Sequence, residues 1–91
     1  MQYKNDKTLI YIKTLGSIIH KKRIAASKES RYNFCNSYEL DSSNLRRIEN
    51  GEIEPKITML LRIAEAFNIP LSELIKNVEQ ELGSDFHVIE M

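Results

Sequence analysis

Two adjacent arginines and an asparagine on one side of a short predicted helix could bind an anion. Over residues 41–50, Leu45 and Ile48 fall together at about 100° per residue. The residues that point roughly the opposite way are Ser43, Arg46, Arg47 and Asn50. Guanidinium groups donate paired hydrogen bonds to phosphate and to guanine, so this side suits an anionic partner. A helix of about ten residues is not stable alone in water, so neighbouring elements must hold its apolar side.

The composition predicts one small folded domain. Hydrophobic residues make up 42% of the 91 residues and charged residues 29%, which favours a globular chain over a disordered one. The formal net charge is zero, but residues 1–51 carry ten Lys or Arg against five Asp or Glu, and residues 52–91 carry three against eight. A basic half and an acidic half are consistent with one DNA-facing side.

The sequence lacks the motifs of exported, membrane-spanning, metal-binding or catalytic proteins. Cys35 is the only cysteine, which excludes an internal disulfide and favours a reducing compartment. We expect Cys35 to be a small packing residue in the core, with a role as a redox sensor as the alternative. No apolar run approaches the roughly 18 residues of a membrane span, and His20 and His87 lack companions at metal spacing. No phosphate-binding glycine loop or nucleophile–base motif is present. We therefore expect a cytoplasmic, non-enzymatic protein with no membrane association, cofactor or metal.

Apolar periodicity and cap residues predict five helices, with no strand before residue 80. Their expected ranges are 8–27, 31–38, 41–50, 57–67 and 70–77. We expect Thr8, Ser30 and Asp41 to cap the first three helices, and Gly51 and Asn68 to end the third and fourth. The fourth helix has the strongest periodicity, and we expect six residues to fill one of its faces: Ile57, Leu60, Leu61, Ile63, Ala64 and Phe67.

The ends of the chain are expected to lie outside this helical domain. We expect a flexible arm over residues 1–7, a DNA-binding domain over 8–78 and an acidic tail over 79–91. Within the tail, residues 86–89 fit either a short strand or a disordered segment.

Two short helices joined by a tight turn, inside a cluster of five, carry several motifs in register. The motifs are Leu15-Gly16 with Ile19, Ser30, the run from Leu45 to Gly51, Pro55 with Leu60 and Ala64, and the run from Ile69 to Leu74. With this order and spacing, residues 15–75 resemble the Cro/phage-repressor (Xre) family of helix-turn-helix proteins. The resemblance implies an all-α, five-helix, lambda-repressor-like domain. Glu39 stands where the family usually has glycine in the turn, so we expect strain there.

The resemblance also implies which residues contact double-stranded DNA. It places the start of the third helix in the major groove, which makes four residues candidates for reading base edges: Ser42, Ser43, Asn44 and Arg47. The helical wheel independently exposes Ser43 and Arg47. The Arg47 guanidinium can donate two hydrogen bonds to guanine O6 and N7, with a phosphate contact as the alternative.

Other charged and polar residues are expected to bind phosphate or to hold the domain together. The candidates for phosphate contact are Arg31, Arg46, Asn50 and Lys56. In the family, an arginine late in the first helix often pairs with a glutamate near the end of the recognition helix. The resemblance therefore implies a structural ion pair between Arg23 and Glu49.

Two functions are compatible with these features. The first is a sequence-specific DNA-binding transcription regulator of repressor type, acting as a homodimer on a palindromic operator. Its dimer surface would use the fifth helix and the acidic tail, unless the apolar residues of that helix form the domain core: Leu71, Leu74, Ile75 and Val78. The second is an antitoxin-like module that captures a partner protein through residues 79–91 and regulates its own operon.

Overall fold

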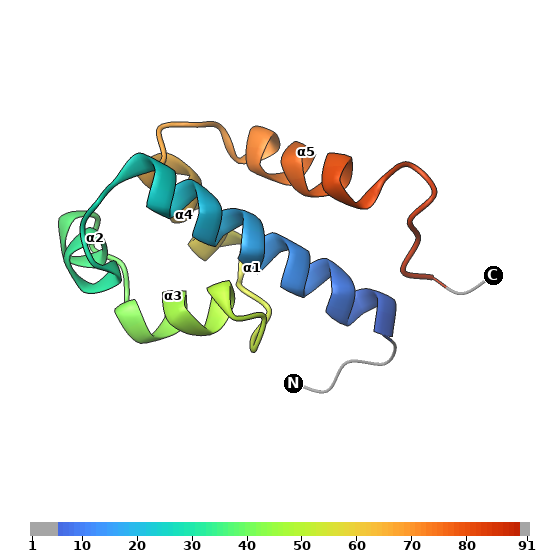
Figure 1. Ribbon diagram of the computed structural model, residues 1–91, viewed down its shortest axis with the longest axis horizontal. Coiled ribbons are helices and arrows are strands. Elements are labelled where there is room, and N and C mark those ends of the chain that lie inside the picture. The colour runs from blue at the N-terminus through green and yellow to red at the C-terminus, as the bar shows by residue number, and fades with distance from the viewer. Residues whose placement is uncertain (1–5, 90–91) are drawn as a thin grey trace.

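The longest helix, α1 (Asp6–Ala26), crosses the middle of the molecule (Figure 1). The computed structural model describes residues 6–89. The remaining helices are α2 (Arg31–Ser37), α3 (Ser42–Glu49), α4 (Ile57–Ala66) and α5 (Leu71–Leu82). Within residues 6–89 no strand is present, so the predicted all-α, five-helix, lambda-repressor-like class is confirmed.

The core is formed by apolar side chains from all five helices. Helix α1 lies between α3 on one side and α5 on the other (Figure 1). The largest side chains that are almost fully buried are Phe34, Ile19, Leu45, Ile48, Ile63, Leu74 and Val78. Burying one Leu, Ile or Phe stabilises a fold by roughly 1.5–3 kcal/mol. These contacts therefore stabilise helices that are too short to form alone.

Leu74 and Val78 belong to this core and are not available for a dimer. Both side chains have zero solvent exposure within the single chain, and Leu71 and Ile75 are partly buried against the same cluster. For Leu74 and Val78 the domain core is therefore the correct assignment and the dimer surface was wrong, because α1 and α4 pack against α5.

Two predicted helix boundaries need correction. Helix α1 begins at Asp6, so Thr8 is an internal residue and Asp6 and Lys7 are not part of an arm. Residues 1–5 of the predicted arm lie outside the described residues. Helix α5 continues to Leu82, five residues beyond the predicted end, because Leu82 packs on the core and the stop comes at Gly83, whose φ is 90°.

The chain after α5 forms turns and bends. Between Gly83 and Ile89 the backbone is neither helix nor strand, so the described part of the tail contains no strand. Because Glu79, Gln80 and Glu81 are helical, the acidic tail starts later than residue 79. Residues 90 and 91 of the predicted tail lie outside the described residues.

Helix α4 does not bury all of its apolar residues on one face. Leu60, Ile63 and Ala64 are buried, whereas Ile57 is 67% exposed and Leu61 is 45% exposed. At about 100° per residue, Ile57 and Leu61 lie at the edge of the apolar stripe. A helix in contact with the core along one side cannot cover that edge, so the apolar face that periodicity predicts is only partly buried.

The turn between α2 and α3 is strained, as expected from Glu39. The φ of Glu39 is 56°, which lies in the left-handed region that residues other than glycine seldom adopt. The turn is closed by the Leu40 N–H, which donates to the Cys35 carbonyl at 2.9 Å, and Leu40 itself is buried. Burial of Leu40 therefore compensates for strain at the preceding residue.

Candidate nucleic-acid interface

Helix α3 starts and stops where its sequence signals predict. The Asp41 carboxylate accepts a hydrogen bond from the Asn44 N–H at 2.9 Å, which caps the first turn. At the other end Gly51 has a φ of 72°, and the Glu52 N–H donates to the Arg47 carbonyl at 2.9 Å. The left-handed conformation of Gly51 and the hydrogen bond from Glu52 to Arg47 end the helix in a Schellman-type turn.

The inner side of α3 is held tightly against α1. Leu45 and Ile48 are each only 1% exposed. Gly16 of α1 faces the end of α3, where an added Cβ would meet the carbonyl oxygens of Ile48 and Glu49. A side chain at position 16 would force the two helices apart, so Gly16 permits their close approach.

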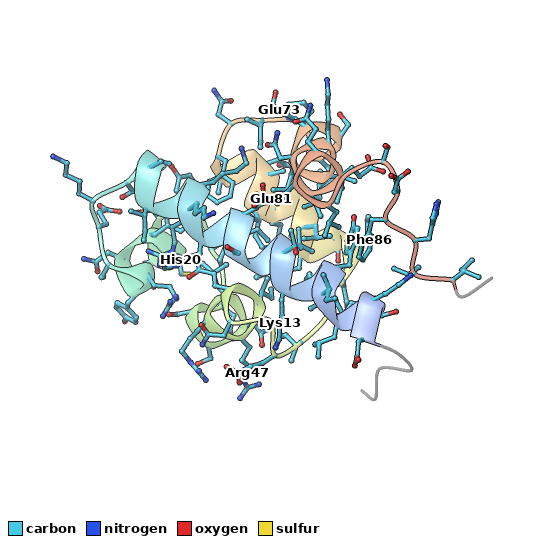
Figure 2. The ribbon with its side chains drawn as sticks, turned by 45° about the vertical axis from the view of Figure 1, so that its right-hand side comes forward. Lys13, His20, Arg47, Glu73, Glu81 and Phe86 are labelled. Atoms are coloured by element: carbon cyan, nitrogen blue, oxygen red, sulfur yellow. The ribbon has the colours of Figure 1, made fainter. Side chains whose placement is uncertain are left out.

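The outer side of α3 carries most of the predicted base-reading residues. Ser43, Asn44 and Arg47 are exposed, and Figure 2 shows Arg47 pointing away from the body of the molecule. Ser42 differs, because it is half-buried beside the Cys35 thiol. Three of the four predicted base-reading residues are therefore free to meet a ligand surface, and Ser42 lies at its inner edge.

Glu49 is the centre of a buried charge cluster. Its carboxylate accepts hydrogen bonds from Arg23, at 2.7 Å to Nε and 3.1 Å to Nη2. Arg31 donates to the same carboxylate from Nε at 3.2 Å and Nη2 at 3.0 Å, and His20 Nδ1 lies 3.0 Å from Oε1. The structure thus brings together Arg23 and Glu49, the pair implied by the resemblance, and adds His20 and Arg31.

This cluster ties three elements to one another. Arg23 and His20 come from α1, Arg31 from the start of α2, and Glu49 from the end of α3. The side chain of Glu49 is 1% exposed, that of Arg23 is 7% exposed, and those of Arg31 and His20 reach 28% and 44%. Buried charges need such partners, since an unpaired charge in the interior costs several kcal/mol.

The pKa of Glu49 is lowered from its ordinary value of 4.5. Burial alone raises this pKa, but the hydrogen bonds from Arg23, His20 and Arg31 and the charge of Arg23 outweigh it. Glu49 is therefore ionised at neutral pH, where it fixes the positions of α1, α2 and α3.

The predicted phosphate-binding residues differ in their surroundings. Arg31 points towards Glu49 instead of extending into solvent. Arg46 and Asn50 are exposed at the end of α3 and both lie against Glu52. Lys56 is exposed at the position before the first residue of α4. The four residues thus do not form one continuous patch of free donors.

Cys35 is packed in the core. It is 1% exposed among the buried apolar residues, and the pKa of its thiol is raised by burial and by the charge of Glu49. The thiol is therefore neutral at physiological pH and shielded from solvent, which suits a packing residue.

Two residues that contact the predicted site residues, His20 and Glu52, were not predicted from the sequence. His20 precedes Arg23 by three residues and so shares its side of α1, which was a usable signal. Glu52 directly follows the helix-ending Gly51, so it had to lie close to the last turn of α3. Figure 2 shows His20 on α1 on the side where α2 and α3 lie.

Comparison with known proteins identifies the class of this domain. A family model described as helix-turn-helix matches residues 40–74, which run from the turn before α3 to the first turn of α5. Comparisons with curated proteins and with solved structures gave no match. The helix-turn-helix match, together with the five-helix fold, supports a DNA-binding domain and a transcription regulator in the general sense.

The described residues contain neither a membrane-spanning helix nor a cluster of metal-binding side chains. Among residues 6–89 no helix is long and apolar enough to cross a membrane. Within the same range no three His, Cys, Asp or Glu side chains are grouped so that they could hold a metal ion.

Proposed function

We propose that this protein is a sequence-specific transcription regulator of repressor type that inserts α3 into the major groove of double-stranded DNA. One observation carries the proposal: α3 is buried along Leu45 and Ile48 and held by Glu49, which leaves Ser43, Asn44 and Arg47 exposed together. A rigid helix with an outward polar side is what groove recognition requires.

In this proposal Arg47 reads a guanine, and Ser43 and Asn44 contact neighbouring base edges. Ser42 lies at the inner edge of this base-reading surface. A bidentate arginine–guanine pair discriminates between bases by roughly 1–3 kcal/mol. Lys56, Arg46 and Asn50 hold the phosphate backbone on one side of the groove. Arg31 adds a contact on the other side, because Glu49 accepts from its Nε and Nη2 and leaves Nη1 for a phosphate.

We propose that the active form is a homodimer on a palindromic operator. One recognition helix covers only a few base pairs, so two copies about one helical turn apart supply the affinity that a single copy lacks. The dimer has to use a surface other than Leu74 and Val78, because both are buried within the chain. Such a regulator works in the cytoplasm with the chromosome. No contact described for residues 6–89 favours the alternative of an antitoxin-like module.

The first test is selection of bound fragments from random double-stranded DNA, followed by sequencing. We expect a palindrome with two half-sites about one helical turn apart. The variant Arg47→Ala should then reduce the preference for the selected site over a scrambled one by about 5- to 150-fold for each bound protomer, which corresponds to 1–3 kcal/mol.

Two further variants separate base reading from general attraction. Lys56→Ala should weaken binding to selected and scrambled DNA alike and reduce the salt slope by about one. Lys76→Ala, an exposed lysine on α5, removes the same charge elsewhere and should change neither property. An Arg47→Ala protein that loses affinity equally on both DNAs would contradict the assignment of Arg47, and absence of binding to any duplex would contradict the proposed function.

A further inference from the structure

Glu52 lies among the donors that the proposed function assigns to phosphate. One of its oxygens, Oε2, accepts a hydrogen bond from the Asn50 side-chain amide at 3.2 Å. The same oxygen lies 3.5 Å from Nη1 of Arg46. Two donors from the last turn of α3 and its cap thus converge on a single anionic oxygen.

A phosphate oxygen would receive the same two donors in the same arrangement. Amide and guanidinium groups both donate to DNA phosphates, and they use the same N–H groups for a carboxylate. The side chains of Arg46 and Glu52 are 47% and 51% exposed, so water competes with their pair and the pair is weak. It can open when a stronger anion approaches.

The Glu52 carboxylate is not placed where it would stabilise α3. A helix C-terminus carries a partial negative charge, which disfavours a carboxylate close to it. The Glu52 N–H closes the turn after α3, but that backbone contact does not depend on the side chain. The carboxylate therefore has no stabilising role in α3 beyond its contacts with Arg46 and Asn50.

We infer that Glu52 is an internal competitor of DNA: its carboxylate occupies the place of a backbone phosphate and lowers affinity for every sequence alike. This inference rests on the proposed function and extends it to affinity control. Binding has to displace Glu52 from Arg46 and Asn50. Breaking an exposed ion pair costs roughly 0.2–1 kcal/mol, and a value in the middle of this range is equivalent to about three-fold in affinity for each bound protomer.

The test compares Glu52→Gln with Glu81→Gln by titrating a duplex at several salt concentrations. Both changes remove one negative charge from an exposed side chain, but Glu81 lies on α5, on the far side of α1 from α3 (Figures 1 and 2). We expect Glu52→Gln to bind selected and scrambled DNA about three-fold more tightly per protomer at low salt, with the gain shrinking as salt rises. Glu81→Gln should bind like the parent protein. Equal affinities of parent and Glu52→Gln would overturn the inference.

A double-mutant cycle distinguishes competition at Arg46 from simple repulsion of DNA. If Glu52 masks Arg46, the gain from Glu52→Gln should fall well below three-fold in an Arg46→Ala background. A gain that is unchanged in that background would overturn the competitor mechanism. Binding of DNA by the parent protein without any gain in Glu52→Gln would overturn this inference alone, whereas a failure of every variant to bind any duplex would overturn the proposed function as well.

Discussion

Replacing Glu49 with glutamine should strongly lower the free energy of unfolding at neutral pH. The change keeps the shape of the side chain but removes the charge that compensates Arg23, whose side chain is 7% exposed. Arg31 and His20 can turn towards water, since their side chains are 28% and 44% exposed. The cost therefore comes mainly from Arg23, and breaking such a buried pair costs about 3–5 kcal/mol. A domain is stable by only about 5–15 kcal/mol, so this is a large fraction of the total.

The measurement is urea unfolding followed by far-ultraviolet circular dichroism. With a slope of about 1–3 kcal/mol per molar urea for a small protein, the midpoint should fall by roughly 1–5 M while the slope stays the same. If the variant is unfolded without urea, refolding it with a stabilising osmolyte gives the same free-energy difference. The matched control is Glu52→Gln, the same chemical change three residues further on in an exposed side chain, which should alter stability by no more than about 0.5 kcal/mol.

The loss should also depend on pH in a defined direction. Because the pKa of Glu49 is lowered in the folded state, its ionised form contributes stability above about the ordinary value of 4.5. That contribution is lost as pH falls through the lowered folded pKa. The difference between the parent protein and Glu49→Gln should therefore be full at neutral pH and narrow below pH 4.5. A loss under about 1 kcal/mol, or a difference that does not vary with pH, would refute the reasoning.

Two further substitutions test the backbone of the domain. Glu39→Gly should raise the free energy of unfolding by about 0.5–1 kcal/mol, because glycine accepts the φ of 56° without strain. The midpoint temperature of thermal unfolding should rise by about 2–8 °C. A fall in this temperature would show instead that the Glu39 side chain stabilises the turn. Gly16→Ala should cost about 1–3 kcal/mol or more, because its Cβ would meet the carbonyls of Ile48 and Glu49. Ser17→Ala, an exposed neighbour on α1, should be nearly neutral in the same denaturation experiment.

Most of the secondary structure could be predicted because its signals are local. Ser30 caps α2 by accepting from the Asn33 N–H at 3.1 Å, and Asp41 caps α3 in the same way. Gly51 and Asn68 adopt positive φ where α3 and α4 were expected to end. Each signal acts within five residues of the chain, so it can be recognised without knowledge of the fold.

The errors occurred where packing between distant segments decides the outcome. Helix α5 was expected to end near residue 77, but contact of Leu82 with the core extends it to Gly83. Ile57 and Leu61 have the right periodicity for burial, yet their side chains are 67% and 45% exposed. Periodicity reports which residues share a face, and it cannot report how wide the covering surface is.

The sequence by itself determined that α3 has an apolar inner side and a polar outer side, because a helix places residues at a constant angle around its axis. Only the tertiary structure decided where the charged side chains of that region point. Arg31 lies 18 residues before Glu49 and His20 lies 29 before it, and no local rule brings such residues together. Their meeting depends on the crossing of α1, α2 and α3, which is set by packing around Gly16, Leu45 and Ile48.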